Sequence, residues 1–348
     1  MKIGIVARSD NTGLGYQTKE LTNMLKPDKV MLIDFSPHNN NTQHPEWYDG
    51  YNVTNILGYP TGRDIEKFLN DLDIVLSCET FYNNEEFIEI AKVKNVKTFL
   101  QYNYELFGNL AKKKMPLPDV LISPSAWELQ SIVDKFGRKA KVVHIPPPTT
   151  PGIFSNALKE NTSKTHNRIL HIGGKRAAMD RNGTDTVVEM LRYSKANYEL
   201  VIRTQTRLEI SSNDSRLTID YNDQKNREDM YSGFDLMVLP RRYAGLCLPM
   251  NEALLSGIPV FMTNISPNNK VLPFDWLVDA SVVDQFRAKT LIDVYGANPK
   301  QLAEMIDEYV MLKDKSEQKR TALEIGINNF APENLKNKYY ELFNSSRI

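Results

Sequence analysis

The sequence lacks features that would define several protein classes at once. It has 2 cysteines among 348 residues, Cys78 and Cys247, which argues against a disulfide framework and favours a reducing compartment such as the cytoplasm. Charge of one sign is not in excess, because 43 Lys and Arg balance 43 Asp and Glu, so the composition does not indicate a non-specific nucleic-acid binder. No run approaches the roughly 20 apolar residues that span a bilayer, so no membrane insertion is expected. The apolar start stops at Arg8 and Asp10, which predicts a first strand and not a secretory signal.

Several catalytic motifs are also missing. No G-x-x-x-x-G-K-[ST] pattern indicates an NTPase P-loop, and no G-x-S-x-G pattern indicates a nucleophile elbow. The 5 histidines show no paired spacing, so no zinc site is expected. Asp71 and Asp73 form a D-x-D, but they precede an apolar strand, and we expect no metal there.

What the sequence does contain is a regular alternation of short Ile- and Val-rich runs with segments of helical period. Such alternation predicts βαβ units and parallel sheets covered by helices on both faces. A first series of strands is predicted at 2–7, 30–34, 74–78, 98–102, 120–123 and 142–145. A second series is predicted at 169–173, 199–204, 216–219, 236–240 and 259–263.

A proline-rich stretch, 146–152, separates the two series. Successive prolines fix φ and remove N–H donors, so this stretch is neither helix nor central strand. We therefore predict two α/β domains, at 1–150 and 165–325. Between them we expect a cleft lined by the carboxyl ends of the strands, where ligands bind in such sheets. The segment 331–343 has the apolar spacing of an amphipathic terminal helix.

Two glycine-containing turns follow predicted strands. The turn 10–18 holds Gly13 and Gly15, but Thr18 takes the third glycine position of a dinucleotide fingerprint. It fits a plain strand-to-helix turn, a looser ligand loop, or an incomplete nicotinamide site with Asp34 on the ribose. The turn 171–183 combines glycines with Lys175, Arg176 and Arg181, which would suit a diphosphate or simply form a solvated basic loop.

The most informative segment is 239–260, in which a strand, a Gly-containing loop, a short helix and another strand follow one another. Glu252 stands early on that otherwise apolar helix. Its carboxylate could cap neighbouring amides or accept hydrogen bonds from the two hydroxyls of a ribose.

This segment resembles the retaining GT-B glycosyltransferases of the family-four type. Their carboxy-terminal domain carries P-S-x-x-E-G-F-G-L-x-x-x-E-A-M-A-x-G-x-P-V, and residues 240–260 here read PRRYAGLCLPMNEALLSGIPV. Further matching pieces are SPSAW at 123–127, KVVHIPP at 141–147 and YSGFDLMVLP at 231–240, so the resemblance covers nearly the whole chain. It implies an α/β fold of two Rossmann-like, doubly wound domains facing across a cleft, with 326–348 packing back on the first domain.

The resemblance also implies an activity and residue roles. A sugar would pass from a nucleoside diphosphate sugar, most readily a UDP-sugar, to an acceptor hydroxyl with retention and without a required metal. Glu252 would hold the ribose. The donor-binding residues would be Gly173, Gly174, Lys175, Arg176, Arg181, Tyr221, Asn222, Gly245, Leu246, Cys247 and Glu252, with the three cations neutralising the diphosphate. The acceptor-side candidates are Gly13, Leu14, Gly15, Tyr102, Asn103 and Glu105.

Departures from the family pattern keep alternatives open. Ala244 replaces the first glutamate of the family's E-x₇-E, and Asn182 stands where a phosphate-binding lysine is usual. The chain could thus be an inactive nucleotide-sugar binding module, or an NAD(P)-dependent oxidoreductase. The acceptor could be a glycan or small molecule. The many asparagines also fit an AT-rich phage genome, so a phage enzyme that modifies a hydroxymethylated DNA base is an alternative.

Overall fold

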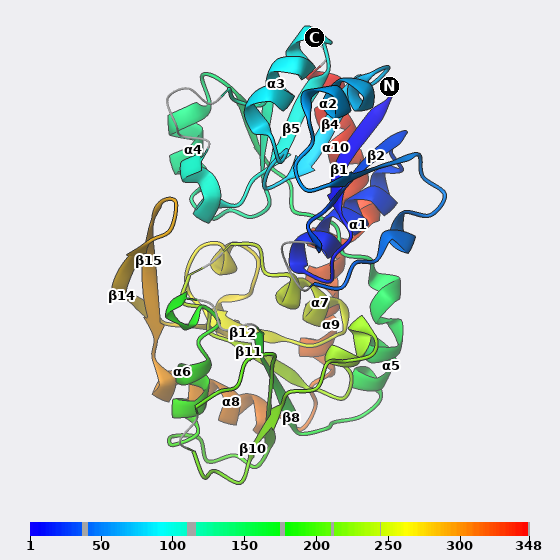
Figure 1. Ribbon diagram of the computed structural model, residues 1–348. Coiled ribbons are helices and arrows are strands. Elements are labelled where there is room, and N and C mark those ends of the chain that lie inside the picture. The colour runs from blue at the N-terminus through cyan, green and yellow to red at the C-terminus, as the bar shows by residue number, and fades with distance from the viewer. Residues whose placement is uncertain (37–40, 110–115, 175–177, 210–211, 244, 347–348) are drawn as a thin grey trace. The chain divides into compact units, whose positions relative to one another are not determined.

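The computed structural model describes residues 1–36, 41–109, 116–174, 178–209, 212–243 and 245–346 (Figure 1). The chain divides into two compact units. Unit 1 comprises Met1–Thr149, Ala288–Thr290 and Pro332–Ile348, and unit 2 comprises Thr150–Arg287 and Leu291–Ala331. Each unit is built on a parallel sheet.

Unit 1 holds a 7-stranded sheet in the order β3-β2-β1-β4-β5-β6-β7, with every neighbouring pair parallel. Strand order reverses between β1 and β4, which is the doubly wound pattern. The strands are β1 (Ile3–Arg8), β2 (Lys29–Asp34), β3 (Val53–Leu57), β4 (Ile74–Cys78), β5 (Lys97–Gln101), β6 (Val120–Ser123) and β7 (Lys141–His144).

Helices cover both faces of this sheet because successive strand residues point to opposite sides. Ile5 of β1 joins the apolar cluster that α1 and α10 complete, whereas Val6 joins the cluster that α2, α3 and α4 complete. Within α10, Tyr339 is fully buried in the first cluster. The helices of unit 1 are α1 (Gly13–Leu25), α2 (Gly62–Leu69), α3 (Asn84–Val93), α4 (Leu129–Phe136) and α10 (Pro332–Ser345).

Unit 2 holds a 6-stranded parallel sheet in the order β10-β9-β8-β11-β12-β13. Its strands are β8 (Arg168–Gly174), β9 (Glu199–Thr204), β10 (Leu217–Asp220), β11 (Leu236–Leu239), β12 (Val260–Thr263) and β13 (Leu277–Val278). Its helices are α5 (Ser155–Ser163), α6 (Thr184–Met190), α7 (Leu248–Leu255), α8 (Pro299–Met311) and α9 (Ser316–Phe330).

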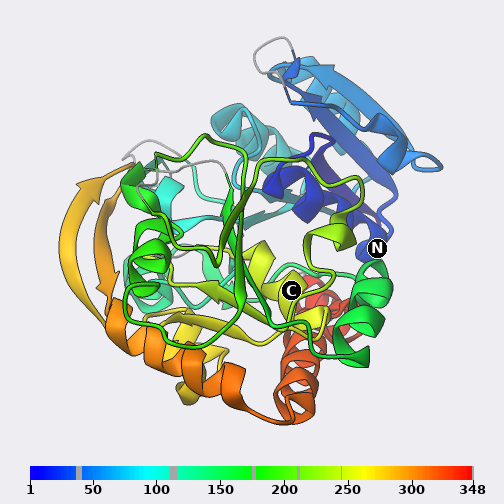
Figure 2. The ribbon, with the colours of Figure 1, turned by 90° about the horizontal axis from the view of Figure 1, so that it is seen from below.

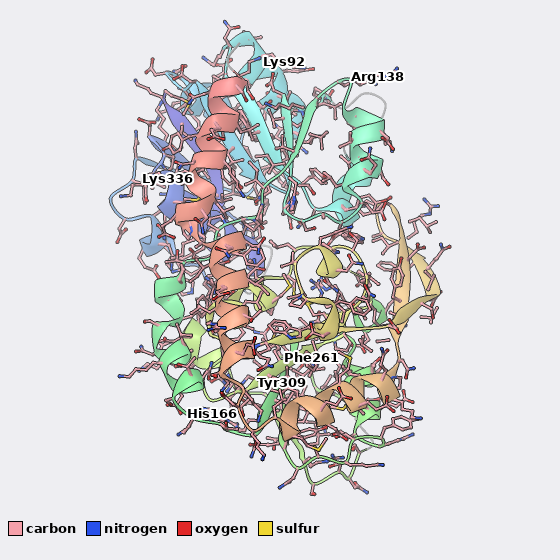
Figure 3. The ribbon with its side chains drawn as sticks, turned by 180° about the vertical axis from the view of Figure 1, so that it is seen from behind. Lys92, Arg138, His166, Phe261, Tyr309 and Lys336 are labelled. Carbon is pink, nitrogen blue, oxygen red and sulfur yellow. The ribbon has the colours of Figure 1, made fainter. Side chains whose placement is uncertain are left out.

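The core of unit 2 ties its helices to the sheet by apolar packing and one buried ion pair. Phe261 of β12 and Tyr309 of α8, labelled in Figure 3, meet edge to face with ring centroids 5.8 Å apart. Lys319 of α9 lies 2.7 Å from a carboxylate oxygen of Asp235, and both side chains are buried. The hydroxyl of Tyr309 donates to the Asp235 carbonyl at 2.7 Å. The start of β11 is therefore anchored from two helices.

Three features of the fold were not among the predicted elements. β3 is an edge strand in which only Ile56 is buried, β13 has only 2 residues, and β14 (Ala280–Arg287) pairs with β15 (Leu291–Ala297) as an antiparallel hairpin. The hairpin extends away from the sheet of unit 2 (Figures 1 and 2). On it, Val282 and Val283 are 50% and 56% exposed, so their side chains do not follow the buried pattern of a core strand. The predicted fold class, two Rossmann-like doubly wound α/β units, is confirmed.

Candidate functional site

The segment between β11 and α7 lies at the carboxyl edge of the unit 2 sheet. β11 ends at Leu239, and α7 begins at Leu248 with Pro249 in its first turn, where a missing N–H costs no helical hydrogen bond. Gly257 follows α7 with a φ of +69°, and a Cβ there would lie 2.8 Å from Leu158 Cδ1. Glycine is thus needed to return the chain into β12. The loop 240–247 occupies the place where ligands bind in open α/β sheets.

Glu252 is held on α7 by two side chains from an earlier turn of the chain. It is 7% exposed, and its Oε1 accepts from Arg227 Nε at 2.9 Å while Oε2 accepts from the Tyr231 hydroxyl at 2.5 Å. Arg227 also forms an ion pair with this carboxylate through a second nitrogen. Burial, with the charge of Glu252 beside it, raises the pKa of Tyr231 well above its usual value. A carboxylate has about four lone-pair positions, and Arg227 and Tyr231 use three of them, so one position on Oε2 remains to accept a hydroxyl group from a ligand.

Sequence reasoning did not single out Arg227. It belongs to the 3₁₀ turn Arg227–Met230, 25 residues before Glu252, and the pattern around it carries no motif. Its guanidinium carbon lies 5.6 Å from the centre of the Phe154 ring. Arg227 orients the predicted ribose-binding carboxylate and balances its charge.

Arg241, in the loop after β11, is a buried charge of unit 2. The residue is 3% exposed, its Nη1 donates to the Leu246 carbonyl at 3.2 Å, and its Nε has no hydrogen-bond partner. Among the residues that the structure describes, no carboxylate pairs with it. A buried cation without a counter-ion is costly, and a bound anion would relieve that cost.

A second buried polar group lies in the same segment. Asn251, in the first turns of α7, is 1% exposed, and neither its Oδ1 nor its Nδ2 finds a partner within the described chain. Buried amides are almost always hydrogen-bonded, so an orphaned one indicates a missing partner. Arg241 and Asn251 thus flank the loop that carries Gly245, Leu246 and Cys247.

The basic loop after β8 is only partly described. Lys175 and Arg176 lie outside the described residues, as does Ala244. Gly173 and Gly174 end β8, and Gly174 has a φ of +62°. The Asn182 amide donates to the carbonyls of Ile172 and Gly173 at 3.0 and 3.1 Å, so it pins the loop to the strand.

Arg181 follows in the same loop. Its carbonyl accepts from the Arg242 N–H at 2.9 Å, which links the loop after β8 to the loop after β11. Gly173, Arg181 and Asn182 line one small hollow together with Thr204.

The predicted base-contacting residues follow β10. Tyr221 is 48% exposed, and its hydroxyl accepts from the Leu208 N–H at 3.4 Å. Asn222 is exposed, and its backbone and amide nitrogens both donate to Asp220. An exposed ring beside an ordered turn can accept a planar base by stacking.

On unit 1, the three predicted glycine-turn residues begin α1. Thr12 caps the helix by accepting from the Gly15 N–H at 3.3 Å, and Gly13 is the first helical residue. A Cβ on Gly15 would lie 1.8 Å from the Asp10 carbonyl oxygen, so this glycine is required by the turn itself. Leu14 is partly buried against the core cluster of α1 and α10.

The other acceptor-side candidates differ in accessibility. Tyr102 is 1% exposed and belongs to the core of unit 1. Asn103 donates to Glu79 Oε1 at 2.5 Å, and Glu105 is half-buried. Glu79 was not among the predicted residues, although its place directly after β4 could have indicated it.

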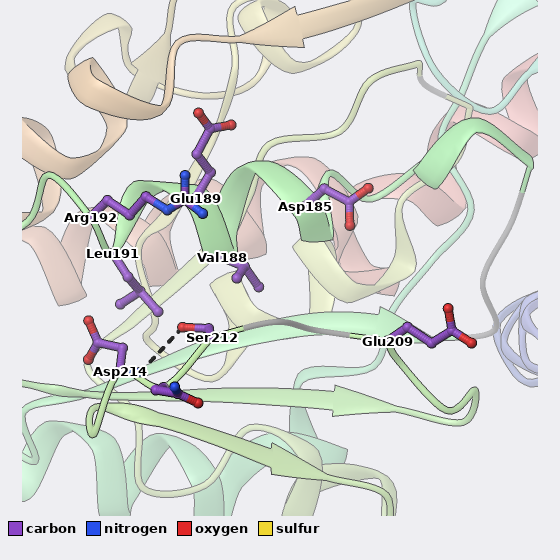
Figure 4. Close-up of a pocket in the computed structure, with 9 residues that line it drawn as sticks. Asp185, Val188, Glu189, Leu191, Arg192, Glu209, Ser212 and Asp214 are labelled. Carbon is purple, nitrogen blue, oxygen red and sulfur yellow. Dashed lines mark hydrogen bonds between the residues drawn. The ribbon is translucent and has the colours of Figure 1, made fainter.

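A separate hollow of about 790 Å³ lies between α6 and the loop after β9 (Figure 4). Its lining includes the carboxylates of Asp185, Glu189, Glu209 and Asp214 against the single cation Arg192. None of the predicted donor-binding residues lines it, and its charge opposes a diphosphate. The segment 240–252 remains the better candidate for an anionic ligand.

The described residues contain neither a candidate metal site nor a candidate membrane span. No group of three or more His, Cys, Asp or Glu side chains is arranged to hold a metal ion. Within the same residues, no helix has the length and apolar character needed to cross a membrane.

Comparison with known proteins shows the fold and not a family. No protein-family model matches the sequence, and no curated protein matches it significantly. Solved structures do match over the whole chain. HepE of Anabaena, in complex with UDP and glucose, is 12% identical and has a TM-score of 0.71, with 99% of this chain and 100% of that chain covered.

Two further solved structures match over a similar length. Sucrose-phosphate synthase of Thermosynechococcus elongatus is 12% identical with a TM-score of 0.68, covering 99% of this chain and 98% of that one. The UDP-forming α,α-trehalose-phosphate synthase of Burkholderia vietnamiensis is 10% identical with a TM-score of 0.67, covering 99% and 100%. The fold of this chain is therefore the GT-B fold of these enzymes.

Proposed function

We propose that the chain is a glycosyltransferase that moves a sugar from a nucleoside diphosphate sugar to an acceptor hydroxyl with retention. A UDP-sugar is the favoured donor, since HepE binds UDP and glucose and shares the fold. The acceptor is either a glycan or other small molecule, or a hydroxymethylated DNA base. The observation that carries the proposal is the burial of Arg241, a cation without a carboxylate partner among the described residues. It lies at the carboxyl edge of an open parallel sheet, where nucleotides bind in such folds.

The donor would lie along the segment that joins β11 to α7. Arg241 and Arg181 would neutralise the diphosphate, and Glu252, oriented by Arg227, would accept a hydrogen bond from a ribose hydroxyl. The remaining donor contacts would come from Gly173, Gly174, Lys175, Arg176, Tyr221, Asn222, Gly245, Leu246, Cys247 and Asn251.

In the proposed reaction, the bond between the anomeric carbon and the diphosphate oxygen breaks as the acceptor oxygen bonds to that carbon. The diphosphate leaves with the bonding electrons, and its departing oxygen takes up the proton that the acceptor hydroxyl loses. Fixed cations and backbone amides stabilise this developing charge without reorganising, which is the largest contribution a site of this kind can make. Arg241 supplies such a cation from a water-poor position.

We also propose that the protein works in the cytoplasm. Both cysteines are free and buried, and burial raises the pKa of the Cys78 thiol. Cysteines that remain as unpaired thiols are usual in a reducing compartment.

A nucleotide-sugar panel tests the function. The protein is heated with UDP-glucose, UDP-galactose, UDP-N-acetylglucosamine, GDP-mannose, ADP-glucose and NADH, and its Tm is recorded. A ligand at 100 times its Kd stabilises the folded state by about 2.7 kcal/mol, so a true donor raises Tm by several degrees.

The panel separates the alternatives. We expect a shift with at least one nucleotide sugar and release of the nucleoside diphosphate on longer incubation. A shift with NADH alone would identify an oxidoreductase. A shift with a nucleotide sugar but no release in the presence of any hydroxyl acceptor would identify a binding module.

A further inference from the structure

A cluster of charged and aromatic side chains gathers at the carboxyl edge of the unit 1 sheet. β1 ends at Arg8, β2 is followed by Phe35, and β4 is followed by Glu79. These three strands are neighbours in the order β2-β1-β4. We call Arg8, Asp10, Phe35, Glu79 and Tyr82 the edge cluster. It occupies the position in unit 1 that the donor segment occupies in unit 2.

The one cation of the edge cluster is already paired. Arg8 forms an ion pair with Asp10, which is fully buried, and the second Asp10 oxygen accepts from the Thr12 hydroxyl at 2.7 Å. The guanidinium also lies 5.2 Å from the centre of the Phe35 ring. The charge of Arg8 is therefore neutralised by Asp10, and Arg8 is not available to bind a phosphate.

Carboxylate oxygens, by contrast, are available at this edge. Glu79 is half-buried at a φ of +63° and accepts from Asn103 through Oε1. Burial, and next the repulsion of Glu105, raise the pKa of Glu79 above its usual value. Glu105 Oε2 is a buried atom with no hydrogen-bond partner within the described chain. An orphaned carboxylate oxygen accepts from a donor such as a hydroxyl group.

An exposed aromatic surface adjoins these carboxylates. Tyr59 is 68% exposed, and its ring packs edge-on against Phe35 with centroids 5.1 Å apart. Phe35 in turn contacts Tyr82 at 5.6 Å between centroids. A flat apolar face beside hydrogen-bond acceptors suits a ligand that has a weakly polar face and a rim of hydroxyl groups.

The charges decide between the two acceptor classes. A DNA backbone brings phosphates, and each phosphate 4 Å from a carboxylate meets a repulsion of about 1 kcal/mol in water and about 4 kcal/mol near a protein surface. A neutral saccharide brings hydroxyl donors and no charge. We propose that the edge cluster, with Tyr59 and Glu105, binds the acceptor as a neutral, hydroxyl-rich saccharide and rejects polyanions. This inference rests on the proposed glycosyl transfer.

The test uses two classes of probe on the intact protein. Maltose, cellobiose, lactose and methyl mannoside represent neutral saccharides, and a duplex oligonucleotide with hydroxymethylcytosine represents the polyanion. Saturation-transfer NMR measures saccharide binding, for which millimolar Kd values are expected. Anisotropy at low salt measures DNA binding.

Glu105→Gln should change the affinities for the two classes of probe in opposite directions: it should weaken the binding of a saccharide and should not weaken the binding of DNA. We expect at least one saccharide to bind, and both Glu105→Gln and Tyr59→Ala to weaken it about tenfold, since each removes an acceptor charge or a packing face. The matched controls, Glu89→Gln on α3 and Tyr193→Ala in unit 2, replace exposed residues away from the cluster and should bind the saccharide as the original chain does.

Three outcomes would overturn the inference. They are the absence of saccharide binding, saccharide binding that neither variant weakens, and DNA binding by the original chain that is at least as tight as its saccharide binding. UDP binding, measured in parallel, keeps this failure distinct from a failure of the proposed function. A chain that binds UDP but no saccharide contradicts only the acceptor class, whereas a chain that binds no nucleotide contradicts the function itself.

Discussion

At the carboxyl edge of the unit 2 sheet, the buried Arg241 has no carboxylate partner in the described chain, whereas at the same edge of the unit 1 sheet Arg8 is paired with Asp10. In the loop after β11, unit 2 has a buried positive charge without a carboxylate partner among the described residues. At the corresponding edge of unit 1, the three carboxylates of Asp10, Glu79 and Glu105 outnumber the one cation of the edge cluster, Arg8. The two sheets share an architecture, so the difference lies wholly in the side chains at the strand ends. One edge suits an anion and the other suits neutral hydroxyl groups.

The largest expected effect tests the paired carboxylate of unit 2. Glu252→Ala leaves the Arg227 guanidinium and the Tyr231 hydroxyl without their acceptor, and breaking a buried pair in this way costs about 3 kcal/mol of the free energy of unfolding. If Glu252 also holds the ribose, the Kd for UDP rises about tenfold, or about 1.4 kcal/mol. Chemical denaturation and calorimetry measure the two quantities separately.

Glu189→Ala is the matched control, because Glu189 is an exposed carboxylate on α6. It should change neither the stability nor the UDP affinity. A Glu252→Ala protein that is destabilised but binds UDP with unchanged affinity would reduce Glu252 to a structural partner of Arg227.

The next effect tests the unpaired cation. Arg241→Met should raise the Kd for UDP about a hundredfold, or about 2.7 kcal/mol, because a buried charge contact with the diphosphate is lost. In the absence of ligand, the free energy of unfolding should stay the same or rise, because the variant loses one hydrogen bond to the Leu246 carbonyl but no longer buries an unpaired charge. For Arg241→Met the larger effect is therefore on the UDP affinity, whereas for Glu252→Ala the larger effect is on the free energy of unfolding.

Arg192→Met, on an exposed arginine of the acidic hollow beside α6, is the control for removing a positive charge from unit 2. It should leave the UDP affinity unchanged. If the Arg241→Met protein binds UDP as tightly as the original chain does, Arg241 does not contact the donor. The contrast between the two sheet edges would then be wrong as well.

The sequence was sufficient for the fold class because core strands are contiguous in the chain. β4, β6 and β9 begin and end at the predicted residues, since each is a short apolar run between turn residues. β3 escaped notice because an edge strand keeps exposed residues such as Asn55 and Leu57, which break the apolar pattern. β14 escaped for the same reason, with exposed valines in place of buried ones.

The candidate site was predictable only where its residues are close in sequence. Motif spacing located the segment 240–260 and Glu252, but Arg227 meets Glu252 only after folding across 25 residues. Arg241 stood within the motif, yet its sequence context, two arginines in a loop, is typical of a solvated turn. Its burial and its missing partner depend on tertiary packing, which no local pattern encodes.

The smallest effect concerns the carboxylates of unit 1. The pKa of Glu79 is raised in the folded protein, so the folded state binds a proton more tightly than the unfolded state does. The stability that this group contributes is therefore fully present below about pH 4, its unfolded pKa, and is lost as pH rises through the folded value. Glu79→Gln cannot ionise and can still accept from Asn103, so it should be more stable than the original chain at pH 7, by a few degrees in Tm at most. That advantage should vanish below about pH 4. Thermal unfolding between acid and neutral pH measures this difference in Tm. If the Glu79→Gln protein is less stable than the original chain at pH 7, a cation neutralises Glu79, and the excess of carboxylates does not destabilise this edge.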